Sequence, residues 1–356
     1  MMNLVASTRR FSPGETWPLS LACLLTVCLL SACSSDTPEE EPPPSEDPNV
    51  ACKDLHTGME GGAVPATLSG TGLFQDIRTR TLAAGVRQFE PVYPLWSDGA
   101  EKTRYVQLPD GCPIETSDMD HWVLPVGAKL WKDFVVDGKL LETRFIARYG
   151  AGRDDFILGA YVWREDGSDA DYTQYGVNNA QGTAHNIPAA KNCKSCHSYL
   201  PERALGFSAL QLNHAGPGVT LTTLVAEGRL STASVPELKV PGDAVASQAL
   251  GYLHANCGNC HNPTGIEFKN MFSLRLSVND KSVEDTATWK TGMGVPVEKF
   301  VTPGVEKRIA PGNPEGSCIV HRMTIRGTTE QMPPLASKVT DSSGLAAIRE
   351  WVGSLH

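Results

Sequence analysis

The sequence predicts an α+β protein in which an antiparallel β-sandwich-like domain precedes a mostly α-helical one. Apolar and polar residues alternate with a period of two within 131–163; one Asp-Gly pair lies between the first two runs and another follows the last, as expected for turns between antiparallel strands. Apolar residues at helical spacing return before 257 and again around 345–352. The chain has 356 residues. A single core rarely grows past about 250–300 residues, so this length suggests two domains.

The composition excludes several classes of protein. Hydrophobic residues make up 41% and charged residues 20% of the chain, which is ordinary for a globular protein and excludes a wholly disordered or fibrous one. No run of 18 apolar residues follows the N-terminal region, so no internal transmembrane helix is expected. The net charge of −9 gives no indication of nucleic-acid binding, which calls for a clustered basic surface.

The N-terminus has the pattern of an export signal. Residues 1–32 contain two arginines and then the apolar stretch Leu19–Leu30, which is too short to span a bilayer. The four residues that end at Cys33, Leu-Ser-Ala-Cys, resemble the lipobox of bacterial lipoproteins, which implies lipidation of Cys33 and cleavage just before it. An ordinary cleavable signal is the alternative. By the same resemblance, Ser34 implies an outer-membrane lipoprotein that faces the periplasm or the cell surface, held to the membrane by its acyl chains.

Residues 33–50 are expected to form an acidic, Pro-rich disordered tether. They are mostly Ser, Pro, Glu and Asp, so they cannot bury apolar surface, and their like charges favour an extended chain. Without residues 1–50, the chain has 29 basic and 33 acidic residues, a net charge of only −4.

Two short motifs of the same form predict the cofactor. They are Cys193-Lys-Ser-Cys196-His197 and Cys257-Gly-Asn-Cys260-His261. C-x-x-C-H is the attachment sequence of c-type haem: the two thiols add to the two vinyl groups of one haem, and the histidine binds its iron. The chain is therefore expected to carry two covalently bound haem c groups, with His197 and His261 as iron ligands.

Zinc and dithiol chemistry are the alternatives for these cysteines. Two C-x-x-C pairs can also form a four-cysteine zinc ribbon, but such pairs usually lie about 15–20 residues apart. Here Cys193 and Cys257 lie much farther apart than that, and a histidine follows each pair. A redox-active dithiol would not need that histidine.

Three further cysteines remain in the body of the chain. Cys52 and Cys112 both lie in the N-terminal region, and they are the candidate pair for a disulfide outside the cytosol. Cys318 lies in the short apolar run 317–320 and is expected to be a small buried hydrophobic residue.

The β-rich domain is assigned to residues 51–184. Strands are predicted at Trp131–Val136, at Leu141–Tyr149 and at Phe156–Trp163, with a two-residue Asp137-Gly138 turn between the first two. The second strand alternates apolar with charged residues, which is typical of a half-buried strand. Four tryptophans are expected to lie in the core: Trp96, Trp122, Trp131 and Trp163.

Residues 185–356 are assigned to a di-haem domain, with a first haem segment at 185–242 and a module at 243–356. Asp243 is a suitable N-cap for a helix that runs into Cys257, and an apolar stripe beside Trp351 predicts a C-terminal helix. This arrangement resembles class I cytochrome c. The resemblance implies that Met332, in a Met-Pro-Pro loop before the last helix, is the sixth ligand of the second iron.

Met323 and Met293 are the competitors of Met332 for that position. The same resemblance implies that a backbone carbonyl near Pro263–Gly265 fixes the ring of His261, as outer-shell partners of ligating histidines do.

The sequence pattern does not single out one sixth ligand for the iron of the first haem. His214 is the first choice, and the alternatives are His185, His254 and Met271. If none of them binds, the first iron is open to a small molecule.

Several longer segments resemble an uncharacterised family of exported bacterial haem-c lipoproteins. The resemblance covers roughly residues 80–355 and includes the segments around both haem motifs. The other segments are Pro94–Arg104, Val126–Lys132, Glu142–Phe145, Ile187-Pro188, Leu205–Asn213, Pro311–Pro314 and Met332–Pro334.

Single-electron transfer between redox partner proteins is the function that these observations favour, rather than catalysis. A di-haem peroxidase with an open first haem is one alternative, although the two motifs lie too close in the chain for two large haem domains. A β-rich domain that binds a substrate or a partner, with the haems as its electron outlet, is the other.

Overall fold

The computed structural model describes residues 52, 58–59, 61–200, 203–265, 271–298, 302–335 and 337–356. The predicted signal peptide, the lipid site at Cys33 and the tether lie outside the described residues. Within these ranges, no helix has both the length and the hydropathy needed to cross a membrane.

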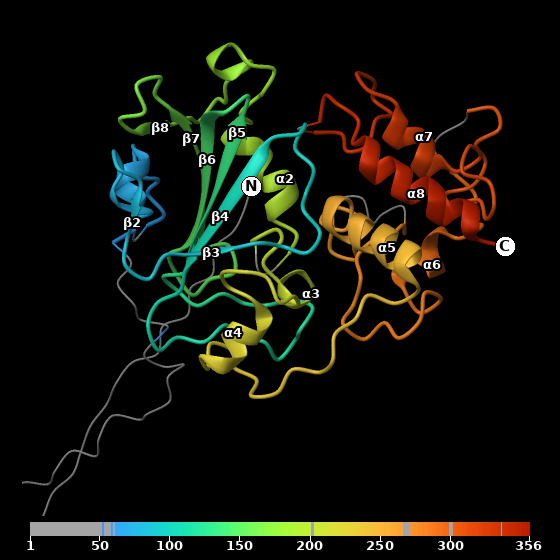
Figure 1. Cartoon of the computed structure of the whole chain (residues 1–356), viewed down its shortest axis with the longest axis horizontal. Coiled ribbons are helices and arrows are strands. Elements are labelled where there is room, and N and C mark those ends of the chain that lie inside the picture. The colour runs from blue at the N-terminus through green and yellow to red at the C-terminus, as the bar shows by residue number, and fades with distance from the viewer. Residues whose placement is uncertain are drawn as a thin grey trace, which may run out of the picture. The chain divides into compact units, whose positions relative to one another are not determined.

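Antiparallel strands build the N-terminal part of the described chain, as predicted (Figure 1). Six of them form one sheet in which each strand pairs with its neighbour in sequence, and two shorter ones form a separate ribbon. The observed architecture is thus a single meander with a small ribbon, rather than the two matched sheets of a sandwich. The ribbon strands are β1 (Phe74–Asp76) and β2 (Thr81–Leu82), and the sheet strands are β3 (Arg87–Phe89), β4 (Glu101–Gln107), β5 (Lys129–Val136), β6 (Lys139–Arg148), β7 (Phe156–Trp163) and β8 (Ala170–Tyr172).

The predicted hairpin between β5 and β6 is confirmed. Asp137 and Gly138 have φ angles of 52° and 72°, and this pair of left-handed residues is what a two-residue type I′ turn requires. The turn pairs Val136 with Lys139, and a register shift between Phe134 and Val135 then brings Lys132 opposite Arg144.

Both faces of the sheet are covered. One face carries Tyr105, Trp131 and Phe145 into a core with the N-terminal ribbon. The other carries charged residues, and Glu142 on that face has no exposed surface at all. The expectation of a half-buried strand was therefore wrong for β6, because the segment around His185 packs on the face that alternation alone assigns to solvent.

The helices follow the strands in the chain. Two short 3-10 turns, η1 (Leu68–Thr71) and η2 (Ala180–Gly182), lie within the β-rich part. The α-helices of the described residues are α2 (Ala190–His197), α3 (Ala209–Leu212), α4 (Leu221–Ala226), α5 (Ala244–Asn256), α6 (Ala287–Gly292), α7 (Cys318–Thr324) and α8 (Ser342–Ser354). Asp243 caps α5 as predicted, since its side chain accepts a hydrogen bond from the amide of Ala246.

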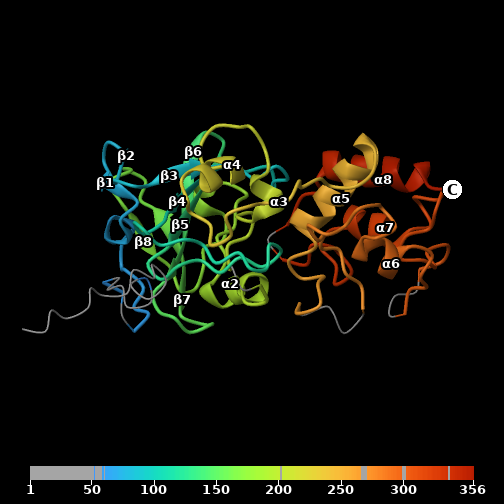
Figure 2. The same ribbon diagram turned by 90° about the horizontal axis from the view of Figure 1, so that it is seen from below.

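Helices α5 and α8 pack against each other (Figures 1 and 2). Ile348, Trp351 and Val352 of α8 are buried in this contact region, as the apolar stripe predicted. The same core includes Phe89 and Trp122 from the β-rich part. One continuous core therefore crosses the boundary at residue 184 that the sequence placed between two domains.

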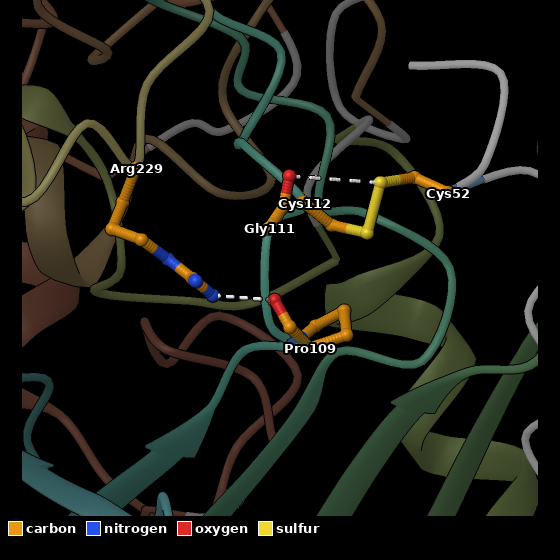
Figure 3. Close-up of a disulfide and its surroundings, with 5 residues drawn as sticks. All are labelled: Cys52, Pro109, Gly111, Cys112 and Arg229. Carbon is orange, nitrogen blue, oxygen red and sulfur yellow. Dashed lines mark hydrogen bonds between the residues drawn. A yellow bond between two sulfur atoms is a disulfide. The ribbon is translucent and has the colours of Figure 1, made fainter. Parts of the chain in front are cut away.

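A disulfide joins Cys52 to Cys112, the candidate pair (Figure 3). Beside it, the Arg229 guanidinium donates a hydrogen bond of 2.7 Å to the carbonyl oxygen of Pro109. These contacts hold the loop after β4, and through Cys52 they tie the start of the folded part to it.

Three of the four tryptophans are in the core as expected. Trp122, Trp131 and Trp163 are at most 3% exposed. Trp96 is different: it is only half-buried, and its indole Nε1 donates a 3.0 Å hydrogen bond to the carbonyl of Val339. Trp96 therefore bridges the β-rich part and the loop before α8.

Candidate functional site

Each C-x-x-C-H motif is positioned by a helix. The first forms the C-terminal part of α2, which lies beside β7 (Figure 2). The second begins where α5 ends, with Cys257 as the C-cap residue, and continues as further turns through His261. A helical turn brings residues i and i+3 to the same side, so both thiols of each motif lie on one face.

The two motifs touch each other, although they lie far apart in the chain. The thiols of Cys196 and Cys260 are hydrogen-bonded. The Cys260 thiol also lies 3.9 Å from the carbonyl oxygen of Ser195. Nearby, the Thr264 hydroxyl donates a 2.6 Å hydrogen bond to the carbonyl of Tyr199. The fold thus places the two predicted attachment sites in direct contact.

Both motifs face one cavity of about 920 Å³. This volume is near the upper end of the roughly 300–1,000 Å³ of ligand pockets, as a site for large planar groups requires. Apolar side chains provide much of the wall, among them Leu95, Trp96, Ile187, Leu205, Phe272, Leu274 and Ile319. The predicted site residues in the wall are Cys193, Cys196, His197, Cys257, Cys260, His261 and Met332.

The ring of His197 is held by a hydrogen bond at Nδ1. Its Nδ1 lies 2.5 Å from the carbonyl oxygen of Arg203, so Nδ1 must carry the proton and donate it. Nε2 is then the nitrogen with the lone pair, which is the usual arrangement of a ligating histidine. Desolvation, together with the nearby cations Lys132, Arg144 and Arg203, lowers the pKa of His197 to about 4, so the ring is neutral at pH 7.

His261 repeats this arrangement. Its Nδ1 donates to the carbonyl oxygen of Phe272 at a distance of 3.3 Å, which again places the proton on Nδ1, as in a ligating histidine. The carbonyl comes from Phe272 rather than from the segment Pro263–Gly265. The expectation of a carbonyl partner is met, but its position in the chain was wrong because the loop after the motif returns to the ring further along the chain.

Two methionines lie in the cavity wall, Met332 and Met323. Met332 is half-buried in the loop between α7 and α8, and its amide donates a 2.8 Å hydrogen bond to the carbonyl of Arg322. Met323 is 5% exposed and belongs to the core around α7. Met293 does not line the cavity.

The structure does not bring His214 to the cavity. Its Nε2 donates a 2.7 Å hydrogen bond to the carbonyl of Glu90, and its Nδ1 accepts one of 2.8 Å from the amide of Gly216. Both ring nitrogens are therefore engaged, and His214 holds the loop after α3. This was the first choice for the sixth ligand, and the geometry does not place it where a ligand is needed.

Of the three alternatives, only His185 lines the cavity. Its Nε2 lies 2.9 Å from the carboxylate of Glu142, and that carboxylate also accepts two hydrogen bonds from Arg144. His254 lies in α5, where its Nδ1 accepts a hydrogen bond from the amide of Leu276. Met271 is 67% exposed.

Several cations line the cavity and were not predicted from the sequence; two of them, Lys132 of β5 and Arg144 of β6, belong to the sheet. Desolvation, followed by repulsion from Arg104, Arg144 and Lys102, lowers the pKa of Lys132 well below its ordinary value. Charged residues on one face of two neighbouring strands were the available signal. On the strand 141–149, the charged residues were expected to face solvent.

The thiols themselves are in distinct environments. Desolvation raises the pKa of Cys257 to about 12, whereas the hydrogen bond from Cys260 lowers the pKa of Cys196 to about 7. All four motif cysteines belong to the described residues. Within those residues, no group of three or more His, Cys, Asp or Glu side chains is arranged to hold a metal ion.

Comparisons of the chain with protein-family models, with curated proteins and with solved structures find no match.

Proposed function

We propose that this chain is a di-haem c-type cytochrome that transfers single electrons between redox partner proteins. The observation that carries the proposal is that both C-x-x-C-H motifs face one cavity, with the Nδ1 of each histidine on a backbone carbonyl. Thiols for attachment and a neutral nitrogen for iron are the donor set that c-type haem uses.

Each haem has its own set of residues. Cys193 and Cys196 would hold the first and His197 would bind its iron; Cys257, Cys260 and His261 would do the same for the second. When bound, the haem irons supply reversible one-electron chemistry. This chain contributes the apolar cavity wall, which limits water access, and the carbonyls of Arg203 and Phe272, which orient the two rings.

The close contact of the two attachment segments favours an electron carrier over an enzyme. Because Cys196 and Cys260 touch, both haems would share one cavity, and an electron could pass between them without a moving domain. For the second haem, the α5–α8 packing and the position of Met332 support the class I cytochrome c-like arrangement. Attachment to the outer membrane through Cys33 is part of the same proposal and rests on the sequence.

The test is expression with the haem-maturation machinery, followed by a pyridine haemochrome count, EPR and the near-infrared spectrum. We expect two low-spin haems per chain, one with the charge-transfer band of methionine ligation. The matched variants C193A/C196A and C257A/C260A should each lose one haem and keep the other. A wild-type protein that carries no haem after this expression would refute the proposal.

One observation favours an enzymatic second candidate. His185, held by the buried Glu142, lines the cavity together with Arg144, and polar groups beside an open iron decide whether it activates a small molecule. A high-spin EPR signal from half of the iron, with binding of cyanide or peroxide to that half, would support this candidate. Two low-spin irons without ligand binding would exclude it.

A further inference from the structure

Residues 94–98, in the connection between β3 and β4, form part of the cavity wall although they belong to the β-rich part. Nζ of Lys102 donates a 2.6 Å hydrogen bond to the carbonyl of Leu95, which fixes the segment to β4. The segment also contacts the end of α5 and the loop before α8 (Figure 1). We call it the clamp segment. Its residues in the cavity wall are Leu95, Trp96, Ser97 and Asp98.

The first contact of the clamp segment is with the second attachment motif. The Trp96 amide donates a 2.7 Å hydrogen bond to Oδ1 of Asn256, and Nδ2 of Asn256 donates one of 3.3 Å to the carbonyl of Pro94. Asn256 is the last residue of α5 and immediately precedes Cys257. The clamp segment is therefore bound to the start of that motif.

The second contact is with the loop between α7 and α8, which contains Met332. Oδ1 of Asp98 accepts hydrogen bonds from the amides of Lys338 and Val339, both at 2.9 Å, and Oδ2 also lies 2.9 Å from the Lys338 amide. The Trp96 indole donates to the carbonyl of Val339. Hydrogen bonds from backbone amides to a carboxylate are roughly twice as strong as those between neutral groups. Asp98 is therefore the principal anchor of this contact.

The side chain of Gln331 connects this contact to Met332. Its Nε2 donates to the carbonyl of Ser337 at 3.0 Å and to that of Pro333 at 3.1 Å. The residues on both sides of Met332 are thus joined to the residue before Lys338. The amide of Met332 itself is hydrogen-bonded to α7. Helix α7 therefore holds one side of Met332, and the clamp segment holds the other.

A further contact joins the same loop to the segment before His185. Nζ of Lys338 donates a 3.1 Å hydrogen bond to the carbonyl of Ala184 and lies 3.5 Å from Oδ1 of Asn179. The β-rich part thus binds both the backbone and the side chain of Lys338. The place of this loop in the cavity wall therefore depends on residues from outside the helical module.

We propose that the clamp segment is a positioning element for the second haem: through Asp98 and Trp96 it keeps Met332 in place as the sixth ligand. This inference rests on the proposed function, because it requires a haem at the second motif with Met332 as its axial ligand. A loop that is already fixed loses less conformational freedom when its side chain binds, which favours that side chain over competing ligands from solution. The β-rich part would then act on the second haem, and not only on the first.

The test compares Asp98→Gly with Asp98→Asn and with the control Glu101→Ala, each in the full chain loaded with haem. Asp98 has a φ angle of 51°, so glycine removes the carboxylate without straining the backbone, and asparagine keeps one oxygen acceptor. Glu101 is exposed and does not line the cavity, so its removal changes the same charge nearby. Trp96→Phe removes the hydrogen bond to Val339 independently, in case Asp98→Gly does not fold.

For each variant we would count haems by pyridine haemochrome and record the near-infrared band that Met332→Leu abolishes. This band is then titrated with imidazole, which competes for the sixth position, and the unfolding midpoint is measured in denaturant. We expect Asp98→Gly to keep two haems but to lose the band at a roughly tenfold lower imidazole concentration, as the loss of hydrogen bonds to a charged group implies. Trp96→Phe should change the titration in the same direction, Asp98→Asn should lie closer to the wild type, and Glu101→Ala should leave it unchanged.

A lower unfolding midpoint with an unchanged imidazole titration in Asp98→Gly and Trp96→Phe would reveal a structural role alone and overturn the inference. An equal effect of Glu101→Ala would also overturn it. A wild-type chain with two haems but no methionine band would overturn the inference and leave the haem assignment standing. A wild-type chain without haem would overturn the proposed function as well.

Discussion

Gly344 at the start of α8 lies directly against the ring of Tyr252 in α5. A Cβ atom built on Gly344 would be 2.1 Å from Cε2 and 2.3 Å from Cζ of that ring, which is far inside van der Waals contact. Tyr252 also lines the cavity. This contact therefore connects the packing of the two helices to the shape of the candidate site.

We expect Gly344→Ala to destabilise the protein by about 1–3 kcal/mol, the usual cost of overpacking. Helix propensity alone predicts that this substitution stabilises the protein, since alanine is favoured over glycine by roughly 1 kcal/mol in a helix. Denaturant unfolding would measure the change. The control is Gly353→Ala in the same helix, where the nearest neighbour of a new Cβ is Pro314 at 3.6 Å. If Gly344→Ala is as stable as Gly353→Ala, the two helices do not pack this closely.

Met332 and Met323 both line the cavity, and matched leucine variants should separate them. We expect Met332→Leu to abolish the near-infrared band of methionine ligation. It should also lower one midpoint potential by on the order of 0.1 V, within the range of about 0.8 V that axial ligands span. Met323→Leu should keep the band, because the change conserves volume in the core. The opposite pattern would assign the ligand to Met323.

The disulfide between Cys52 and Cys112 closes a loop of 60 residues. The chain-entropy relation predicts that its removal costs about 4 kcal/mol, at the upper end of typical measured values. We expect Cys52→Ala/Cys112→Ala to lower the denaturation midpoint accordingly, and dithiothreitol to do the same to the wild type. Cys318→Ala, which removes a buried free thiol, is the control and should cost much less.

Asp133 should make the folded state less stable at high pH. Desolvation raises its pKa to about 6, against an ordinary 3.8, although Thr143 and Tyr105 donate hydrogen bonds to it. A carboxyl with a raised pKa in the folded state favours folding below pH 4, and this contribution disappears as the pH rises through 6. Asp133→Asn should therefore stabilise the protein at pH 8, by on the order of 2–3 kcal/mol, and much less at pH 4. An equal effect at both pH values would contradict the shift.

The features that depend on nearby residues could be predicted from the sequence. The turn at Asp137-Gly138, the cap at Asp243 and the strand Phe156–Trp163 follow from patterns within a few residues, and the structure confirms all three. The Cys52–Cys112 pair could be guessed as well, because few other cysteines remained.

The features that depend on distant contacts could not be predicted. The burial of Glu142 depends on the distant segment around His185, and the carbonyl that orients His261 belongs to the backbone of Phe272, which has no side-chain signal. His214 was the first choice for the sixth ligand of the first haem, but its ring is bound to the carbonyl of Glu90, next to β3. The alignment of Arg104, Lys132 and Arg144 across three strands becomes visible only when the strands are in register.

The contact between Cys196 and Cys260 has a consequence for biogenesis. In an oxidising compartment, two thiols this close, one of them with a pKa of about 7, are well placed to oxidise to each other. A chain that folded before receiving haem would then consume one thiol from each attachment site. For the proposed cytochrome, attachment of at least one haem before the two motifs meet would avoid this loss, so the order of assembly would matter as well as its components.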